Sequence, residues 1–137
     1  MMASIHKEVL VAAPAEEVWA ALRDVANPHR LFRGVLADAR MEGDARVVTF
    51  ANGLVVRERI VAVDDGRRRV AYAALREGLV HHSASMQVFA EGAGSSRFVW
   101  ISDFLPDEAA GAIGPLIDGG AAAMKRTLED PDRRGGP

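Results

Sequence analysis

The chain has 137 residues, of which 49% are hydrophobic, with a formal net charge of -2 at pH 7 and no cysteine. This length supports a single domain, and the scattered basic residues argue against a nucleic-acid-binding surface. The cysteine count excludes disulfides, zinc–thiolate sites and thiol chemistry.

Domain organisation follows from the distribution of apolar residues. We expect one domain over residues 1–130 and a disordered polar tail over 131–137, PDRRGGP. No stretch is apolar enough to insert into a membrane, and the N-terminus lacks the apolar core of a signal peptide, so a cytoplasmic protein is expected.

The N-terminal part predicts one strand and two short helices. Residues 6–13, HKEVLVAA, form the strand. Pro14 suits the first turn of a helix, and Glu16 and Glu17 suit the positive end of its dipole. Asn27-Pro28 then predicts a cap and first-turn proline for a second helix containing HRLF.

From Val35 onward, short apolar runs alternate with turn signals such as EGD, ANG, DDG and REG, which predicts an antiparallel meander. The expected strands lie near residues 35–41, 45–50, 54–63, 67–75, 79–90 and 96–104. A last helix is expected from Pro106 to about Glu129. Its apolar residues fall on one face, and they are Ile113, Ile117, Met124 and Leu128, with Gly120 among them.

The turns also predict how the strands pair. Three-residue hairpin loops commonly end in a glycine in the left-handed conformation. The segments 51–53, 64–66 and 76–78 each end in glycine and fit this pattern. With a five-residue loop over 91–95, the expected pairs are Phe50 with Leu54, Val63 with Arg67, Leu75 with Leu79, and His82 with Phe104. A two-residue Asn52-Gly53 turn is the alternative, but it would slip one strand by one residue and turn Phe50 outward.

This register places Arg46, Glu58, Tyr72 and His82 in one row across four strands, where neighbours lie about 5 Å apart. The adjacent rows on the same face are largely apolar: Val48–Val56–Ala74–Val80 and Ile60–Val70–Ala84–Ser102. A carboxylate in such a row needs a partner. We therefore predict that Glu58 and its neighbours form a polar belt in an otherwise apolar cavity.

Several segments resemble one known superfamily. VLVAAPAEEVWAALRDV resembles the opening of the START-like, polyketide cyclase/dehydrase (SRPBCC) superfamily, in which a V-x-A-P-x-E-x-V-W run joins the first strand and helix. VVRERIVAVDDGRRRVAYAA resembles its central hairpin. SSRFVWISDFLP and GGAAAMKRTLE resemble its last strand and the end of its helix. The resemblance extends from about Ile5 to Glu129.

The resemblance implies an α+β helix-grip fold. A curved antiparallel seven-stranded sheet would wrap around a long C-terminal helix, with two short helices between strands one and two and a cavity between sheet and helix. In plant abscisic-acid receptors a glutamate in a similar strand faces the cavity, and Glu58 looks equivalent. The short EGD turn and the Gly-Pro-Gly-Gly content of the last helix depart from the family, so ligand identity does not carry over.

Each candidate residue has a functional and a structural interpretation. Glu58 is a ligand anchor, an acid/base or a partner of Arg46, which could itself bind a carboxylate or phosphate. Tyr72 and His82 line the cavity, hydrogen-bond a ligand or move a proton. The pair Gly119-Gly120 lets either a ligand approach the helix or the ring of Trp100 pack beneath it. The predicted ligand-binding residues are Arg46, Val48, Phe50, Val56, Glu58, Tyr72, His82, Met86, Phe98, Trp100, Ser102, Ile117, Gly120 and Met124.

No metal site or cofactor is expected. His81 and His82 point to opposite faces of their strand, and phosphate-loop, dinucleotide and G-x-S-x-G motifs are missing from the sequence. The preferred function is binding of a small hydrophobic or amphipathic molecule, such as a lipid, an aromatic or a polyketide-like compound. The alternatives are a cyclase or dehydratase using Glu58 or His82, and a chaperone-activator-like interaction domain without ligand. An exposed edge strand allows a homodimer without requiring one.

Overall fold

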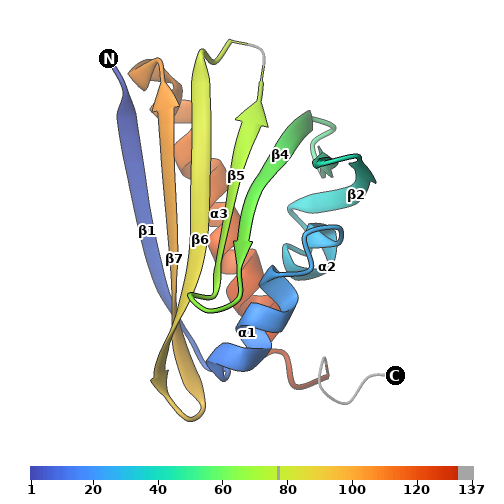
Figure 1. The fold of residues 1–137 in the computed structure, drawn as a ribbon, viewed down its shortest axis with the longest axis vertical. Helices are drawn as coiled ribbons and strands as arrows, with labels where there is room; N and C mark the ends of the chain where they lie inside the picture. Colours follow the sequence, from blue (N-terminus) through green and yellow to red (C-terminus); the bar gives the residue numbers. More distant parts are fainter. Residues whose placement is uncertain (77, 133–137) are drawn as a thin grey trace.

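Seven antiparallel strands form one sheet in the computed structural model, which describes residues 1–76 and 78–132 (Figure 1). The strand order is β1-β7-β6-β5-β4-β3-β2. The elements are β1 (Ala3–Val11), α1 (Ala15–Leu22), α2 (Pro28–Leu31), β2 (Leu36–Glu42), β3 (Ala45–Phe50), β4 (Val55–Asp64), β5 (Arg69–Leu75), β6 (His81–Gly92), β7 (Ser95–Leu105), a 3-10 turn (Asp107–Ala109) and α3 (Ala110–Glu129).

This architecture confirms the predicted helix-grip fold. The long helix α3 lies along one face of the sheet, and the two short helices lie between β1 and β2 in the chain (Figure 1). The first strand is Ala3–Val11 rather than 6–13, because its pairing with β7 runs from Ala3–Phe104 to Val11–Ser96. The prediction of a tail falls mainly on residues 133–137, which lie outside the described residues.

The helices form where the sequence places their apolar faces. Helix α1 follows Pro14 and buries Val18, Trp19 and Leu22. Helix α3 buries the face predicted for it: Ile113, Ile117, Gly120, Met124 and Leu128. The C-terminal end of α3 is tied to the end of β1, since Lys125 Nζ donates to the carbonyl of Leu10 at 2.7 Å and Glu129 Oε2 accepts from the amide of Ala12 at 2.8 Å.

Two of the predicted registers are correct. In the β3–β4 hairpin, Arg46 pairs with Glu58 and Val48 with Val56. The amide of Phe50 donates to the carbonyl of Leu54 at 2.8 Å, so the loop has three residues and the alternative two-residue turn is excluded. Gly53 ends this loop at a φ of +93°, a left-handed conformation that suits glycine. In the β6–β7 hairpin, His82 pairs with Phe104 as expected, and a bulge extends the strands to Gly92 and Ser95.

The other two registers are wrong by two residues. The β4–β5 loop spans residues 65–68 instead of 64–66, and its left-handed residue is Arg68, at a φ of +51°, not Gly66. A bulge at Val61 then places Glu58 opposite Ala74 rather than Tyr72. The predicted 76–78 turn includes residue 77, which is not described, and the β5–β6 loop spans 76–80.

These shifts change which residues lie opposite one another on neighbouring strands, but the cavity-lining residues stay on the inner face of the sheet. Tyr72 lies opposite Ile60 and Ala84, not Glu58 and His82. Because the shift is two residues from Ile60 toward Val55 and along β5–β6, the side chains there keep their predicted side of the sheet, whereas next to the β4–β5 loop the shift is three. Val80 is the exception among the row members, since it lies in the loop and is 81% exposed.

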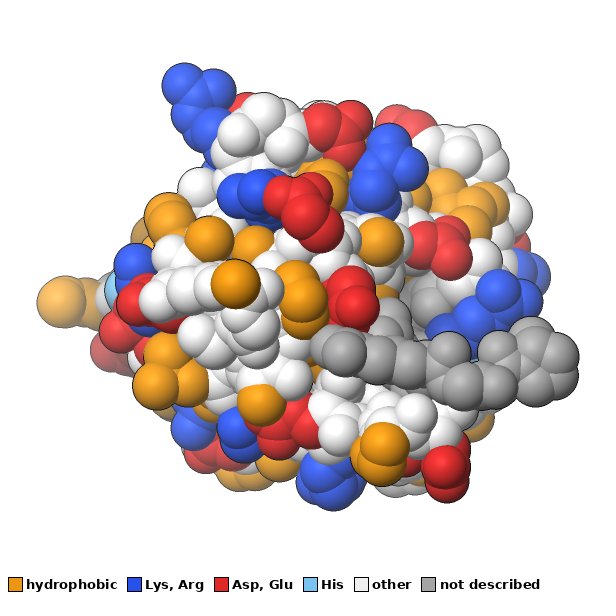
Figure 2. All heavy atoms as spheres, turned by 90° about the horizontal axis from the view of Figure 1, so that it is seen from below, with side chains coloured by type: hydrophobic (Ala, Val, Ile, Leu, Met, Phe, Trp, Pro, Cys, Tyr) orange, Lys and Arg blue, Asp and Glu red, His pale blue; other side chains and the backbone are white. Residues whose placement is uncertain are grey.

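Other surface features can be stated for the described part of the chain. Acidic, basic and hydrophobic side chains are interspersed on the end of the molecule seen in Figure 2. No helix within residues 1–76 and 78–132 is both long and apolar enough to cross a membrane. Strands β1 and β2 are the two edges of the sheet, and a homodimer through either stays a prediction.

Candidate functional site: a cavity between the sheet and helix α3

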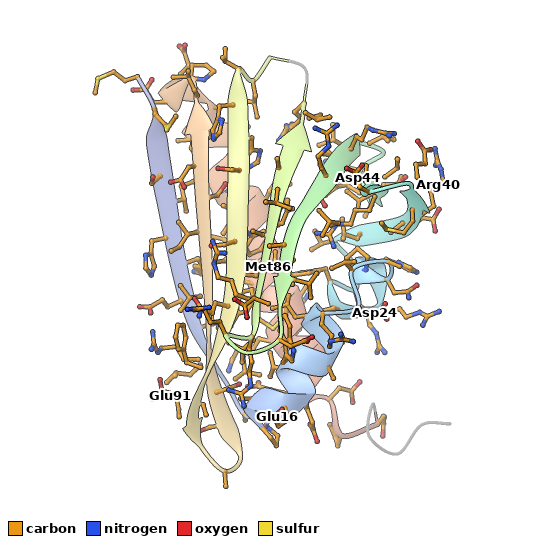
Figure 3. The ribbon with its side chains drawn as sticks, in the orientation of Figure 1. Glu16, Asp24, Arg40, Asp44, Met86 and Glu91 are labelled. Carbon is orange, nitrogen blue, oxygen red and sulfur yellow. The ribbon has the colours of Figure 1, made fainter. Side chains whose placement is uncertain are left out.

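A cavity of about 80 Å³ lies between the inner face of the sheet, helix α2 and helix α3. Its volume is enough for several water molecules or for part of a small organic molecule. Met86 of β6, one of its lining residues, lies near the middle of the sheet in Figure 3. The charged residues labelled there lie around the periphery: Glu16, Asp24, Arg40, Asp44 and Glu91.

The structure brings twelve of the fourteen predicted ligand-binding residues to this cavity: Arg46, Val48, Phe50, Val56, Glu58, Tyr72, His82, Met86, Trp100, Ser102, Ile117 and Gly120. Phe98 and Met124 are fully buried in the main core instead. They belong to the part of the core that α1 closes against β6 and β7. Which of the lining residues bind a ligand stays a prediction.

Eight lining residues lie outside the predicted ligand-binding set: Pro28, Phe32, Val35, Leu36, Ala74, Arg76, Ile113 and Leu116. Of these, only Ala74 and Ile113 were expected to face inward. Four of the others come from α2 and the segment after it, whose position depends on packing rather than on local periodicity. The position of Arg76 could have been predicted from the sequence. Tyr72 and Ala74 face inward, and Arg76 is the next residue of that alternation, just beyond the end of β5.

The buried ion pair at this site joins adjacent positions on β3 and β4. Arg46 Nε donates to Glu58 Oε1 at 2.7 Å, and the two side chains are only 7% and 12% exposed. The guanidinium also donates to the carbonyl of Val25 at 3.1 Å and lies 5.2 Å above the ring of Tyr72. Glu58 therefore has the structural partner that the sequence predicted, and it still lines the cavity.

Tyr72 completes this group, and its hydroxyl stays protonated. Burial raises the pKa of the Tyr72 hydroxyl well above its usual range, and the nearby charge of Glu58 raises it further. The charge of Arg46 and the indole N–H of Trp100 act in the opposite direction. A neutral phenol at this position can donate a hydrogen bond to a ligand oxygen.

His82 does not join the Arg46, Glu58 and Tyr72 group, because the two-residue shift places Ala84 opposite Tyr72. Its Nε2 lies 2.7 Å from Ser102 Oγ, and its Nδ1 is buried without a hydrogen-bond partner among the described residues. Burial lowers the pKa of His82, and the charges of Arg76 and His81 lower it further. The imidazole is therefore neutral near pH 7.

Trp100 forms the wall of the cavity beneath α3. A Cβ atom on Gly120 would lie 2.9 Å from the indole ring, so a glycine is needed here for Trp100 to pack against the helix. This contact supports the predicted packing role of Gly120, which also lines the cavity, and its contact with a ligand stays a prediction. The ring also packs against Phe32, with centroids 5.8 Å apart. Its Nε1 is buried and lies near the Tyr72 hydroxyl, whose pKa it lowers, but it makes no well-formed hydrogen bond within residues 1–76 and 78–132.

The described residues contain no cluster of three or more His, Cys, Asp or Glu side chains that could hold a metal ion. The chemistry available in the cavity is thus that of its side chains: a buried ion pair, a protonated phenol, a neutral imidazole beside a hydroxyl, an indole N–H and the guanidinium of Arg76.

Comparison with known proteins places this architecture in a family. The family model described as polyketide cyclase / dehydrase and lipid transport matches residues 2–130, which confirms the resemblance predicted from the sequence. No protein with a curated function matches the chain significantly.

Solved structures share the fold. An uncharacterised Bacillus thuringiensis protein superposes with a TM-score of 0.84 at 17% identity, covering 93% of this chain and 100% of that one. A Thermobifida fusca protein gives 0.76 at 25% identity, with coverages of 91% and 92%. Norcoclaurine synthase from Thalictrum flavum, in complex with dopamine and hydroxybenzaldehyde, gives 0.74 at 21% identity, with coverages of 100% and 90%.

Proposed function

Because the chain belongs to the polyketide cyclase/dehydrase and lipid transport family, we propose that its cavity binds a small amphipathic molecule with an aromatic or acyl body. The observation that carries this proposal is the combination of apolar walls with buried polar atoms that lack partners. His82 Nδ1 is such an atom among the described residues, and Trp100 Nε1 makes no well-formed hydrogen bond there although it lies near the Tyr72 hydroxyl. A buried polar group left unpaired costs about 1–3 kcal/mol, so a ligand or water that supplies a partner is favoured.

The cavity offers two different surfaces to such a molecule. Val48, Val56, Met86 and Ile117 provide apolar contact for its body. Tyr72 and the other polar groups lie on the sheet side, where they can receive its polar end. An apolar pocket with a few convergent polar groups is the usual form of a small-molecule site.

A thermal-shift screen of the purified protein against small aromatic, acyl and polyketide-like compounds tests the proposal. A ligand at 100 times its dissociation constant stabilises the fold by about 2.7 kcal/mol, which raises the midpoint of unfolding by roughly 5–10 °C in a domain of this size. A screen in which no compound raises the midpoint would contradict binding and would favour the interaction-domain alternative.

Matched variants on β5 show whether the bound molecule occupies this cavity. Ala74 lines the cavity, whereas the neighbouring Ala73 points to the opposite face of the sheet. Ala74→Leu is expected to abolish the ligand-induced shift by filling the cavity, and Ala73→Leu is expected to retain it. Equal shifts in both variants would place the ligand elsewhere.

One observation favours an enzymatic function as the second candidate. His82 is a neutral imidazole in the cavity, and its Nδ1 has no partner among the described residues. Such a group can accept a proton from a bound substrate. Glu58 is held by Arg46 and is less suited to this role. If a ligand of the wild type is also converted, His82→Gln should lose turnover even when the ligand is saturating, where a change in its dissociation constant has no effect on the rate.

A further inference from the structure

The charges around the cavity do not cancel. Among the described lining residues, the charged side chains are Arg46, Glu58 and Arg76, since His82 is neutral. Arg46 and Glu58 neutralise each other at 2.7 Å. Arg76 forms no ion pair or hydrogen bond with any described residue, although it is half-buried. Among the described residues, the cavity therefore carries one positive charge without a paired negative charge.

The polar atoms that remain available are mainly donors. A guanidinium and an indole N–H can only donate hydrogen bonds, so Arg76 and Trp100 both favour a ligand that supplies acceptors. The hydroxyl of Tyr72 stays protonated and can donate as well. Glu58 is the one carboxylate among the described lining residues, and its Oε1 already accepts from Arg46.

We propose that the molecule bound in this cavity is a small monocarboxylic acid whose carboxylate pairs with Arg76. The inference rests on the proposed function and names the chemical class of its ligand. A carboxylate supplies two acceptor oxygens in the planar arrangement that a guanidinium binds through two parallel hydrogen bonds. One negative charge also balances the one unpaired positive charge, whereas a phosphate dianion would leave an excess.

The neighbourhood of Arg76 supports a carboxylate at this end of the cavity. Arg76 is close enough to His82 for its charge to act on the imidazole, and both residues line the same space. A neutral His82 adds no second charge but can donate through one ring nitrogen. The apolar body of the acid would then extend toward Val56, Ile117 and the ring of Trp100.

Matched pairs of acids and amides test this inference, because they differ in charge and hardly in shape. Cinnamate against cinnamamide and hexanoate against hexanamide provide an aromatic and an acyl pair. We expect isothermal titration calorimetry to show the acid of at least one pair binding about tenfold more tightly than its amide. Raising the salt concentration should weaken the acid and not the amide.

Two arginine variants test whether the preference for the acid comes from a local contact or from the net charge of the protein. One arginine lies in β5 and the other directly after it. Arg76→Gln is expected to remove the preference for the acid and to leave the amide unchanged. Arg69→Gln is the control, since Arg69 is similarly half-buried, lies on the outer face of β5 and does not line the cavity. This control should retain the preference.

The outcomes distinguish the two proposals. Binding of the amides as tightly as the acids, or an acid preference that survives Arg76→Gln, would overturn the carboxylate inference and leave the proposed function standing. The carboxylate inference would also be overturned, and the proposed function would stand, if none of the four probes bound but neutral compounds of the screen did. If no compound of any kind binds, both proposals are wrong.

Discussion

Glu58 and Arg46 occupy paired positions on β3 and β4, and both side chains are nearly withdrawn from solvent. Replacing Glu58 by alanine leaves the guanidinium with the Val25 carbonyl as its acceptor among the described residues. An uncompensated buried charge costs about 3–5 kcal/mol. We expect Glu58→Ala to lower the free energy of unfolding by about this amount, measured by urea denaturation.

An exposed pair on the same hairpin is the control for this prediction. Asp44 Oδ2 lies 3.6 Å from Arg59 Nε, and the side chains are 73% and 58% exposed. Asp44→Ala should change the free energy of unfolding by less than about 1 kcal/mol. Arg46→Met combined with Glu58→Leu should recover most of the lost stability. Equal effects of Glu58→Ala and Asp44→Ala would contradict a buried pair.

Two adjacent glycines of α3 differ in what surrounds them. A Cβ on Gly120 would meet the ring of Trp100 at 2.9 Å, whereas a Cβ on Gly119 would meet nothing within 4 Å. Gly119→Ala should stabilise the protein by about 1 kcal/mol through helix propensity. Gly120→Ala should destabilise it by about 1–3 kcal/mol, with a change in tryptophan fluorescence. Stabilisation by both substitutions would show that Trp100 is not packed against Gly120.

At the scale of elements, local sequence predicts the strands and helices better than their pairing. The Ala51-Asn52-Gly53 turn gives the β3–β4 register, because one glycine must adopt a left-handed conformation. The run DDGRRR is compatible with several loop conformations. In the structure the side chain of Asp64 accepts a hydrogen bond from the amide of Arg67 at 3.0 Å, which stabilises one of them. The longer loop and the bulge at Val61 then shift the register by two residues.

The conformation of Arg68 allows this loop to be tested. A side chain other than glycine costs about 1–2 kcal/mol in the left-handed region, where Arg68 has a φ of +51°. Arg68→Gly and Arg68→Ala both remove the ion pair with Glu16. The difference between their free energies of unfolding therefore measures the effect of the backbone conformation alone. We expect the glycine variant to be more stable by about 1 kcal/mol in urea denaturation.

Arg67 is the matched position for this comparison, because it lies in the same loop without a positive φ. Arg67→Gly should be no more stable than Arg67→Ala, since glycine there only increases the entropy of the unfolded chain. The register predicted from the sequence places both residues in the strand after Gly66, so the absence of a glycine advantage at residue 68 as well as at residue 67 would favour that register over the one in the structure.

For the whole molecule, the prediction of the cavity survived two wrong registers. At the cavity-lining positions the errors were of two residues, and a strand presents every second side chain to the same face. Glu58, Tyr72 and His82 therefore reached the cavity although they do not form one row. What the sequence could not predict is the contribution of α2, because the position of Phe32 is set by contact with Trp100 across the cavity.

The stability of the molecule should also depend on pH through His82. Burial lowers the pKa of this imidazole in the folded protein, whereas in the unfolded chain it is about 6.5. As the pH falls, the unfolded state thus binds the proton first. The contribution of His82 to stability is complete above about pH 6.5 and is lost as the pH falls toward the folded-state pKa.

Urea denaturation at about pH 7.5 and about pH 5.5 isolates this contribution. Carboxylates with a lowered pKa, such as Asp65 and Glu129, also contribute to stability, but their contribution is lost only near pH 4 and below. The wild type should lose stability between the two conditions, and His82→Gln should lose less. His6→Gln, which changes an exposed histidine on β1, should behave like the wild type. If His82→Gln instead lost as much stability as the wild type, the imidazole would not be buried in solution, and the cavity wall it forms would be open to water.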